Sequence, residues 1–276
     1  MMVKIALFQS QTGIDPAANA TLLADAVGQA ADGGAAMLFT PEMSGLLDRD
    51  ADRAAKNVRL EENDEVLAAV RDAAHKHGIW VHIGSLAVRT EGRQLANRAF
   101  VIDPRGEIRA RYDKIHLFDV DLPTGESWRE SNVYRHGAEA VIVDGTPVGK
   151  LGLTICYDLR FPALFARLAE ANADVIAVPA AFTVSTGKAH WEVLLRARAI
   201  EASVFIVAAA QSGHHEDGRN TYGHSMVVDP WGEVLLDMKE GPGVAFAEID
   251  LSRITDVRSR VPALSHRRPI EQAVAR

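Results

Sequence analysis

Three reactive side chains in this sequence share one position relative to the predicted strands. Glu42 and Cys156 come at the carboxyl ends of short apolar runs, and Lys114 follows a strand expected at 107–112. Sites in open α/β sheets are built where the strands end, so we expect the three residues to converge. A carboxylate, an ammonium and a thiol brought together supply a base, an electrostatic stabiliser and a nucleophile, which nucleophilic catalysis requires.

Cys156 is the only cysteine in the chain. A buried structural thiol explains the residue type equally well, since free cysteines are often fully buried. However, Cys156 lies at a strand-to-helix junction, where the N–H groups of a helix N-terminus favour a thiolate. The backbone N–H of Tyr157 is placed there to act as an oxyanion donor. A single cysteine also excludes an intrachain disulfide and is typical of a reducing compartment, so we expect a cytoplasmic protein.

The charged candidates have ordinary alternatives when each is considered alone. Lys114 has the residue type of a solvated surface lysine, although its apolar neighbours favour a segment that packs against the body. Glu42 is flanked by apolar residues, so it is predicted to be less exposed than an average glutamate. Glu130 lies in a loop and carries no signal of its own.

The elements that position these residues are strands and helices that alternate along the chain. Helices are predicted at 16–31, about 62–77, 162–171, about 189–202 and shortly after 250. Strands are predicted at 3–9, 36–40, 79–87, 97–103, 107–112, 149–156, 174–179, 204–210, 223–229, 233–237 and 244–250. The segment 120–130, with Pro123 and Gly125, is expected to be a loop. The pattern predicts one α/β or α+β layered domain over residues 1–276, with sheets covered by helices.

Composition narrows the classes of function that the chain can have. The 276 residues include 37 acidic and 30 basic side chains, a net charge of −7, so the basic footprint of a nucleic-acid-binding protein is missing. The longest apolar run, 204–210, is far too short to span a membrane. The N-terminal residues are predicted to form a strand and not a signal peptide. We therefore expect a soluble enzyme that binds neither nucleic acid nor membranes.

Three segments, in order, resemble the nitrilase superfamily of carbon–nitrogen hydrolases. They are TPEM at 40–43, YDKIHLFD at 112–119 and GLTICYDLRFP at 152–162. The resemblance extends over nearly the whole chain and implies a four-layer α-β-β-α sandwich that commonly forms homodimers. It also implies roles at the matching positions: Cys156 as nucleophile, Glu42 as general base, Lys114 as oxyanion stabiliser and Glu130 as a second catalytic glutamate. No metal and no other cofactor is implied.

Within the superfamily, the second half is most similar to the deaminated-glutathione amidase branch. The similar segments are HWEVLLRARAIE at 190–201, QSG at 211–213 and YGHSMVVDPWG at 222–232. The resemblance implies hydrolysis of the amide to 2-oxoglutarate and cysteinylglycine through a thioester on Cys156. Arg160 is a candidate for binding the α-keto carboxylate, with a structural ion pair as the alternative. Phe182 and Thr186 are candidate pocket walls, although Phe182 has the residue type of a core side chain as well.

Other functions remain open at this stage. An ω-amidase acting on 2-oxoglutaramate or another short ω-amide would use the same chemistry in a shorter pocket. A metal-dependent hydrolase would use the histidines at 75, 77, 214 and 215, but their spacing lacks a third ligand, which favours surface histidines. A non-catalytic binding protein on the same scaffold is disfavoured because Glu42, Lys114, Glu130 and Cys156 are all present.

Overall fold

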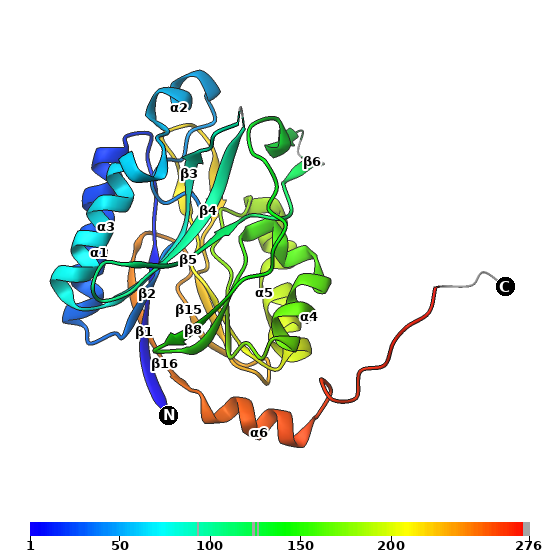
Figure 1. The fold of residues 1–276 in the computed structure, drawn as a ribbon. Helices are drawn as coiled ribbons and strands as arrows, with labels where there is room; N and C mark the ends of the chain where they lie inside the picture. The colour runs from blue at the N-terminus through cyan, green and yellow to red at the C-terminus, as the bar shows by residue number, and fades with distance from the viewer. Residues whose placement is uncertain (93, 123–124, 126, 273–276) are drawn as a thin grey trace.

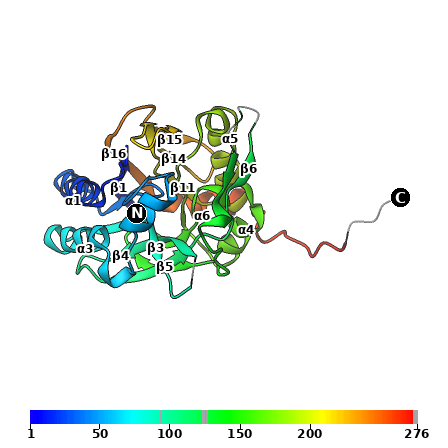
Figure 2. The same cartoon turned by 90° about the horizontal axis from the view of Figure 1, so that it is seen from above.

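Two six-stranded mixed sheets pack face to face, and each carries helices on its outer surface (Figure 1). The computed structural model describes residues 1–92, 94–122, 125 and 127–272. Seen from above, α1 and α3 lie on one side of the sheets and α4 and α5 on the opposite side (Figure 2). This arrangement confirms the layered α/β class expected from the pattern of strands and helices, and the four-layer α-β-β-α order that the family resemblance implied.

The first sheet has the strand order β16-β1-β2-β3-β4-β5. Its outer face packs against two helices through a cluster of small and branched apolar side chains. The elements are β1 (Met2–Gln9), α1 (Pro16–Asp32), β2 (Met37–Phe39), α3 (Glu65–His77), β3 (Trp80–Arg89), β4 (Leu95–Ile102), β5 (Ile108–Asp113) and β16 (Gly243–Asp250).

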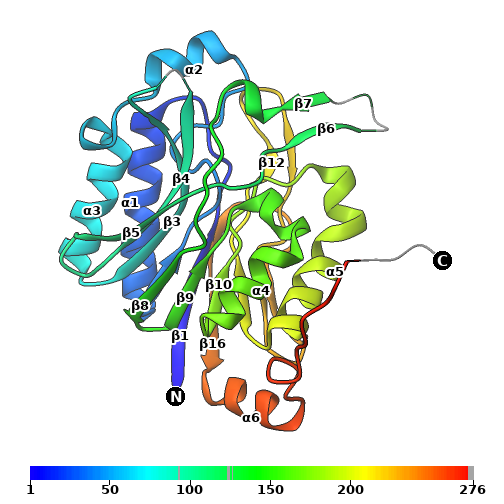
Figure 3. The same ribbon diagram turned by 45° about the vertical axis from the view of Figure 1, so that its right-hand side comes forward.

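The second sheet has the order β15-β14-β11-β10-β9-β8 and is covered by α4 and α5 (Figure 3). One apolar cluster fills the space between the two sheets and includes Ile5 and Leu7 from the first and Leu151 and Ile176 from the second. The elements are β8 (Ile142–Thr146), β9 (Gly149–Leu153), α4 (Pro162–Glu170), β10 (Val175–Ala177), α5 (Val184–Ala202), β11 (Phe205–Ala208), β14 (Met226–Val228) and β15 (Val234–Asp237).

Several short elements at the ends of the sheets were not expected from the sequence. The segment 120–130 contributes to a small hairpin, β6 (Asp119–Asp121) and β7 (Ser127–Arg129), and its Pro123 lies outside the described residues. The others are α2 (Ala51–Asn57), the hairpin β12 (Ser212–His214) and β13 (Asn220–Tyr222), and single 3-10 turns η1 (Glu61–Asn63), η2 (Glu130–Asn132) and η3 (Cys156–Arg160). The last helix, α6 (Ser252–Arg260), was expected.

The helix predicted at about 189–202 begins five residues earlier, at Val184. Its first turn lacks an apolar stripe, so periodicity does not reveal it. This turn packs against another segment: Gly187 lies so close to the Tyr222 ring that an added Cβ atom would be 2.3 Å from it. Across the described residues, no helix combines the length and the apolar character needed to cross a membrane.

The strand directions place the candidate site. In the first sheet β1, β2 and β3 are parallel, and in the second β9, β10 and β11 are parallel. Parallel strands end at the same edge of a sheet. Glu42 follows β2 and Cys156 follows β9, and the backbone bridge Ser10–Gln211 joins the two sheets at this edge. The fold therefore brings the two segments together.

One histidine is enclosed in the core beside the end of β2. His82 on β3 is completely buried, and its ring lies 5.6 Å from that of Phe39. Among the described residues, neither of its ring nitrogens has a hydrogen-bond partner. Burial without compensation disfavours the charged imidazolium and lowers the pKa of His82 to about 3.

Replacing His82 by leucine is expected to make the fold less sensitive to acid. The unfolded chain binds a proton at His82 below about pH 6.5, whereas the folded protein does so only near its lowered pKa. As the pH falls between these values, wild type loses about 1.4 kcal/mol of stability per pH unit from this group. The free energy of unfolding, measured with denaturant at about pH 6 and about pH 4, should fall more between these values in wild type and in the surface control His136→Leu than in His82→Leu. Equal pH slopes in all three proteins would contradict the assignment.

Candidate active site

A sharp backbone turn presents Cys156 at the end of the second sheet. Cys156 is the first residue of η3 and has a φ of 48°, which is uncommon for a residue other than glycine. Its N–H donates to the carbonyl oxygen of Pro179 at 2.8 Å, and this bond holds the turn. The next residue is Tyr157. Outside η3, no backbone carbonyl oxygen of the described residues accepts a hydrogen bond from its N–H. The turn therefore directs the thiol into a cavity and leaves one adjacent N–H available.

Lys114 lies buried between two carboxylates. Its Nζ is 2.8 Å from Glu42 Oε1 and 2.8 Å from Glu130 Oε2, and only 2% of its side chain is exposed. Burial alone would lower its pKa, but the charges of Glu130 and Glu42 outweigh that effect and raise the pKa of Lys114 well above its usual value. Lys114 is therefore a fixed positive charge beside the thiol.

Asn97 on β4 is hydrogen-bonded to both carboxylates and fixes their relative position. Its Nδ2 donates to Glu42 Oε1 at 3.0 Å and to Glu130 Oε1 at 3.0 Å. The second oxygen of Glu42 accepts from the N–H of Ala181 at 3.0 Å. The second oxygen of Glu130 accepts from the N–H of Phe118 at 2.7 Å. Sequence reasoning missed Asn97, although a polar residue inside a buried strand is a signal that could have found it.

The same environment keeps the thiol protonated at rest. Burial raises the pKa of Cys156, and the negative charge of Glu42 raises it further, while Lys114 has a smaller effect in the opposite direction. The net pKa lies well above the usual value for cysteine. The arrangement therefore pairs a neutral thiol with a carboxylate that is positioned to take its proton.

A buried aspartate braces the turn that carries Cys156. Asp158, completely buried, accepts from the Tyr112 hydroxyl at 2.6 Å and from the Ile155 N–H at 2.8 Å. Its other oxygen lies 2.7 Å from His116 Nδ1, and the His116 ring stacks on Phe161 at 3.6 Å. These bonds tie η3 to the segment that follows β5, which also carries Lys114. The sequence contained no local signal of this bracing role.

A second buried amide supports the loop of Glu42. Gln211 donates through Nε2 to the Glu42 carbonyl oxygen at 2.9 Å and to Thr12 Oγ1 at 2.7 Å. Its Oε1 accepts from Ser10 Oγ at 3.0 Å. The loop after β2 is thus fixed by residues from both sheets, which limits the movement of the carboxylate.

A cavity of about 550 Å³ opens above this cluster. Glu42, Lys114, Glu130 and Cys156 all line it, as do Tyr157, Phe182 and Thr186. Seven of the eight residues singled out from the sequence therefore lie around one cavity.

Arg160 is not among the residues that line the cavity. Its guanidinium carbon is 6.0 Å from the centre of the Tyr157 ring and 5.6 Å from that of Phe182, and its Nη1 is 3.3 Å from His190 Nδ1. Its guanidinium thus packs near two residues that line the cavity, and a direct contact with substrate stays a prediction.

The histidines considered as metal ligands lie apart from the cavity lining. His215 is buried, with Nδ1 3.0 Å from the Thr12 carbonyl oxygen and Nε2 2.7 Å from Thr221 Oγ1. His214 lies 3.0 Å from Asn220 Oδ1. Over the described ranges, no three histidine, cysteine, aspartate or glutamate side chains form a group able to hold a metal ion.

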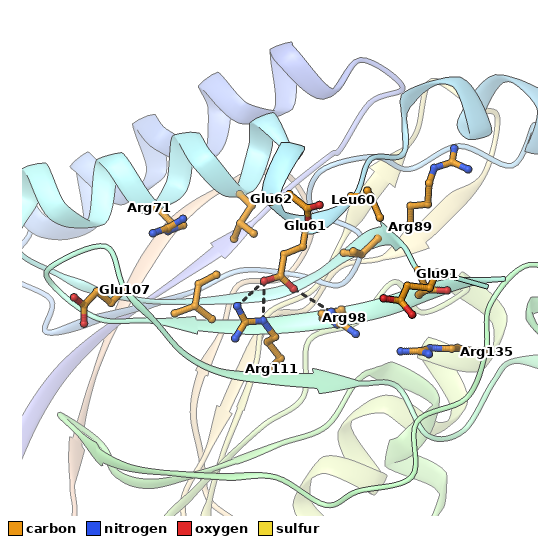
Figure 4. Close-up of a pocket in the computed structure, with 14 residues that line it drawn as sticks. Leu60, Glu61, Glu62, Arg71, Arg89, Glu91, Arg98, Glu107, Arg111 and Arg135 are labelled. Carbon is orange, nitrogen blue, oxygen red and sulfur yellow. Dashed lines mark hydrogen bonds and ion pairs between the residues drawn. The ribbon is translucent and has the colours of Figure 1, made fainter. Parts of the chain in front are cut away.

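A second hollow lies between α3 and strands β4 and β5, and Glu61 pairs there with Arg98 and Arg111 (Figure 4). Glu61 accepts from Arg111 at 2.7 Å and from Arg98 at 3.0 Å. Arg98 also pairs with Asp113 at 2.6 Å, and Arg71 donates to the Gly106 carbonyl oxygen. Arg98 and Arg111 are thus held in ion pairs, and Arg71 and Arg89 donate to backbone carbonyl oxygens, so we place the chemistry at the cavity that contains Cys156.

Comparison with known proteins agrees with this geometry. The family model described as carbon–nitrogen hydrolase matches residues 4–259. Deaminated glutathione amidase of Mus musculus is 42% identical over 252 residues, which cover 89% of this chain and 77% of that protein.

Solved structures share the fold over almost the whole chain. The NitFhit protein of Caenorhabditis elegans has a TM-score of 0.89 and 39% identity; the match covers 97% of this chain but only 65% of the longer NitFhit chain. A mutant amidase from Nesterenkonia sp. AN1, with an acetamide group bound covalently to its active-site cysteine, has a TM-score of 0.81 and 26% identity over 96% of this chain and 94% of its own. The chain therefore belongs to the carbon–nitrogen hydrolase family of the nitrilase superfamily, and it is a hydrolase that acts on amides.

Proposed function

We propose that this protein hydrolyses the amide of deaminated glutathione to 2-oxoglutarate and cysteinylglycine, with Cys156 as the nucleophile. The observation that carries the proposal is the buried cluster of Cys156, Glu42, Lys114 and Glu130 at the base of one cavity. The substrate is supported by relatives that bear this name at about 40% identity.

In the first half of the reaction, the Glu42 carboxylate takes the thiol proton as the sulfur attacks the amide carbon. The ammonium of Lys114 and the N–H of Tyr157 stabilise the oxyanion that forms. Glu42 then gives the proton to the leaving nitrogen, the C–N bond breaks, and cysteinylglycine departs. The 2-oxoglutaryl group remains on Cys156 as a thioester.

In the second half, Glu42 takes a proton from water as the water oxygen attacks the thioester. The same two donors stabilise the second oxyanion, and its collapse breaks the C–S bond. The thiolate recovers the proton from Glu42, and 2-oxoglutarate is released. Glu130 acts by holding Lys114 in place, through contacts of 2.8 and 3.0 Å to Nζ.

The experiment that tests the function compares two substrates under steady-state conditions. Wild type is expected to release 2-oxoglutarate from deaminated glutathione with a higher kcat/KM than from 2-oxoglutaramate, because the cavity extends well beyond the catalytic cluster. A preference for 2-oxoglutaramate would make the protein an ω-amidase with the same chemistry. No activity on either compound would overturn the proposal.

Glu42→Gln is expected to separate amide hydrolysis from simple thiol reactivity. The variant lacks the base, so kcat should fall by roughly 10²–10⁴-fold. It also lacks the negative charge that raises the pKa of Cys156, so thiolate becomes more accessible beside Lys114. Alkylation by iodoacetamide should therefore be as fast as in wild type or faster, as measured by intact-protein mass. A parallel loss of both reactions would indicate general damage to the site, and Glu139→Gln on the surface is the control.

We also propose that residues 1–276 work as one domain in a cytoplasmic homodimer. The outer face of α5 exposes Val193 and Ile200, and the β14–β15 turn, in which Trp231 is exposed, packs against Ile200 through Gly232. Such an apolar surface favours association with a second copy. Sedimentation is expected to give a dimer for wild type and a monomer for Val193→Asp with Ile200→Asp. A monomeric wild type would contradict the dimer.

A further inference from the structure

Two arginine side chains lie over the same tryptophan ring in the wall of the active-site cavity. The guanidinium carbon of Arg219 lies 5.1 Å from the centre of the Trp128 ring, and that of Arg49 lies 5.8 Å from it. All three residues line the cavity that contains Cys156. They come from separate segments: the loop after β2, strand β7, and the turn between β12 and β13.

Most of the donors on these two guanidinium groups remain available. Arg219 uses Nε in a 2.6 Å bond to Asp217, and neither of its terminal nitrogens has an acceptor among the described residues. Within the same ranges, Arg49 donates no hydrogen bond and forms no ion pair, while its neighbour Asp48 is bound by Arg53 at 2.7 and 2.8 Å. Stacking on a ring uses the face of a guanidinium and leaves its edge free for a carboxylate.

The charge of the cavity is opposite to that of the molecule. The chain carries a net charge of −7, yet the part of the cavity lining that the structure describes contains five basic and three acidic side chains. Glu42, Glu130 and Lys114 together contribute one net negative charge at the base. On the remaining wall, Arg129 pairs with Asp121 and Arg219 with Asp217, whereas Arg49 has no carboxylate partner among the described residues. The wall around Arg49 therefore keeps a positive charge that attracts an anionic group remote from the reacting bond.

We propose that Arg49 and Arg219, held against Trp128, bind the terminal carboxylate of the leaving group. This inference rests on the proposed function, in which the leaving group is cysteinylglycine. Deaminated glutathione has carboxylates at opposite ends, and Lys114 is already paired with two glutamates, so a different cation must bind each end. Planar guanidinium edges match a carboxylate with two parallel hydrogen bonds.

The position of the two arginines assigns them to one end of the substrate. The Tyr157–Phe182 wall, with the Arg160 guanidinium close to both rings, is the candidate site for the α-keto acid. The Phe118 ring lies between that wall and Trp128, 5.0 Å from Tyr157 and 6.5 Å from Trp128. The Trp128 subsite is therefore separate from the acyl wall. It selects the long substrate over 2-oxoglutaramate, which has no carboxylate on its leaving side.

The test combines changes in the enzyme with a change in the substrate. Deaminated glutathione, its analogue with a carboxamide in place of the glycine carboxylate, and 2-oxoglutaramate are assayed with wild type, Arg49→Gln and Arg219→Gln. For wild type, the carboxamide is expected to lower kcat/KM by roughly 10- to 100-fold, the effect of a lost charge-assisted hydrogen bond. Each variant is expected to show a loss of this size on deaminated glutathione, little further loss on the carboxamide, and unchanged kcat/KM on 2-oxoglutaramate.

Two controls make each outcome decisive. Arg49 forms no ion pair or hydrogen bond within the described residues, so Arg49→Gln is expected to leave the fold intact. It therefore still tests the subsite if Arg219→Gln disturbs the fold by breaking the Arg219–Asp217 pair. Arg167→Gln, on the exposed face of α4, should leave kcat/KM unchanged on every substrate. Equal losses on all three substrates, or a wild type indifferent to the carboxamide, would overturn the subsite while leaving the amidase function intact. A wild type inactive on deaminated glutathione would instead overturn the proposed function.

Discussion

Cys156→Ala is expected to lower kcat by about 10⁴-fold or more on deaminated glutathione and on 2-oxoglutaramate alike. The variant has no atom that can form the thioester, and Lys114 and Tyr157 can then stabilise only a direct attack by water. The fold should survive, because the change removes one sulfur from the cavity wall and Asp158 still braces η3. Release of 2-oxoglutarate in a stopped assay gives the rate.

Two further measurements separate a lost nucleophile from a damaged protein. Cys156→Ser should also be inactive, since a serine hydroxyl is a much weaker nucleophile when its base is a carboxylate. Both variants should unfold at a denaturant midpoint close to that of wild type. Mass spectrometry of quenched reactions should show the 2-oxoglutaryl adduct on wild type only. Turnover by Cys156→Ala within tenfold of wild type would eliminate the covalent mechanism.

Lys114→Met is expected to destabilise the fold by about 3–5 kcal/mol as well as abolish activity. The lysine is buried between Glu42 and Glu130, and its removal leaves two neighbouring carboxylates without a cation. Asn97 is bonded to both carboxylates and can share only one amide nitrogen between them. Burying a charge without its partner costs far more than the pair contributes, so this change should be the most destabilising of those considered.

The pH dependence gives this prediction a specific signature. Without Lys114, the folded protein raises the pKa of one carboxylate above its unfolded value, because two like charges share a buried site. The folded state then binds a proton that the unfolded state has released, so the variant loses stability relative to wild type as the pH rises above about 4.3. Denaturant unfolding at mildly acidic and neutral pH measures this. Lys188→Met, on the exposed side of α5, should show neither effect, and a pH-independent loss in Lys114→Met would contradict the like-charge explanation.

The strands that position the site were predictable because their pattern is local. Apolar runs at 36–40 and 149–156 correspond to β2 and β9, and the residues that follow them, Glu42 and Cys156, lie at one edge of the sheets. Three motifs in order were enough to indicate the family, and the family model and the solved structures bear this out. The boundaries were less accurate where tertiary contacts set them, as at the first turn of α5 against Tyr222.

The residues that tune the site were not predictable from the chain alone. Asn97 reaches Glu42 across 55 positions and Asp158 reaches Tyr112 across 46. Periodicity describes neighbours within a few residues, so it contains no information about such partners. The resemblance indicated Glu130, but only the folded chain brings its carboxylate to Lys114. Likewise, the sequence suggested Arg160 as a pocket cation, whereas the arginines that line the cavity include Arg49 and Arg219.

By itself, then, the sequence determined the layered α/β class, the family, and the identity of the groups that could act on an amide. The tertiary structure decided their protonation and their surroundings: a buried lysine between two glutamates, a neutral thiol, and a positive wall around Trp128. The physical reason is that residue type and spacing specify local conformation, whereas burial and long-range contacts specify electrostatic energy. Catalysis and substrate choice both depend on that second quantity.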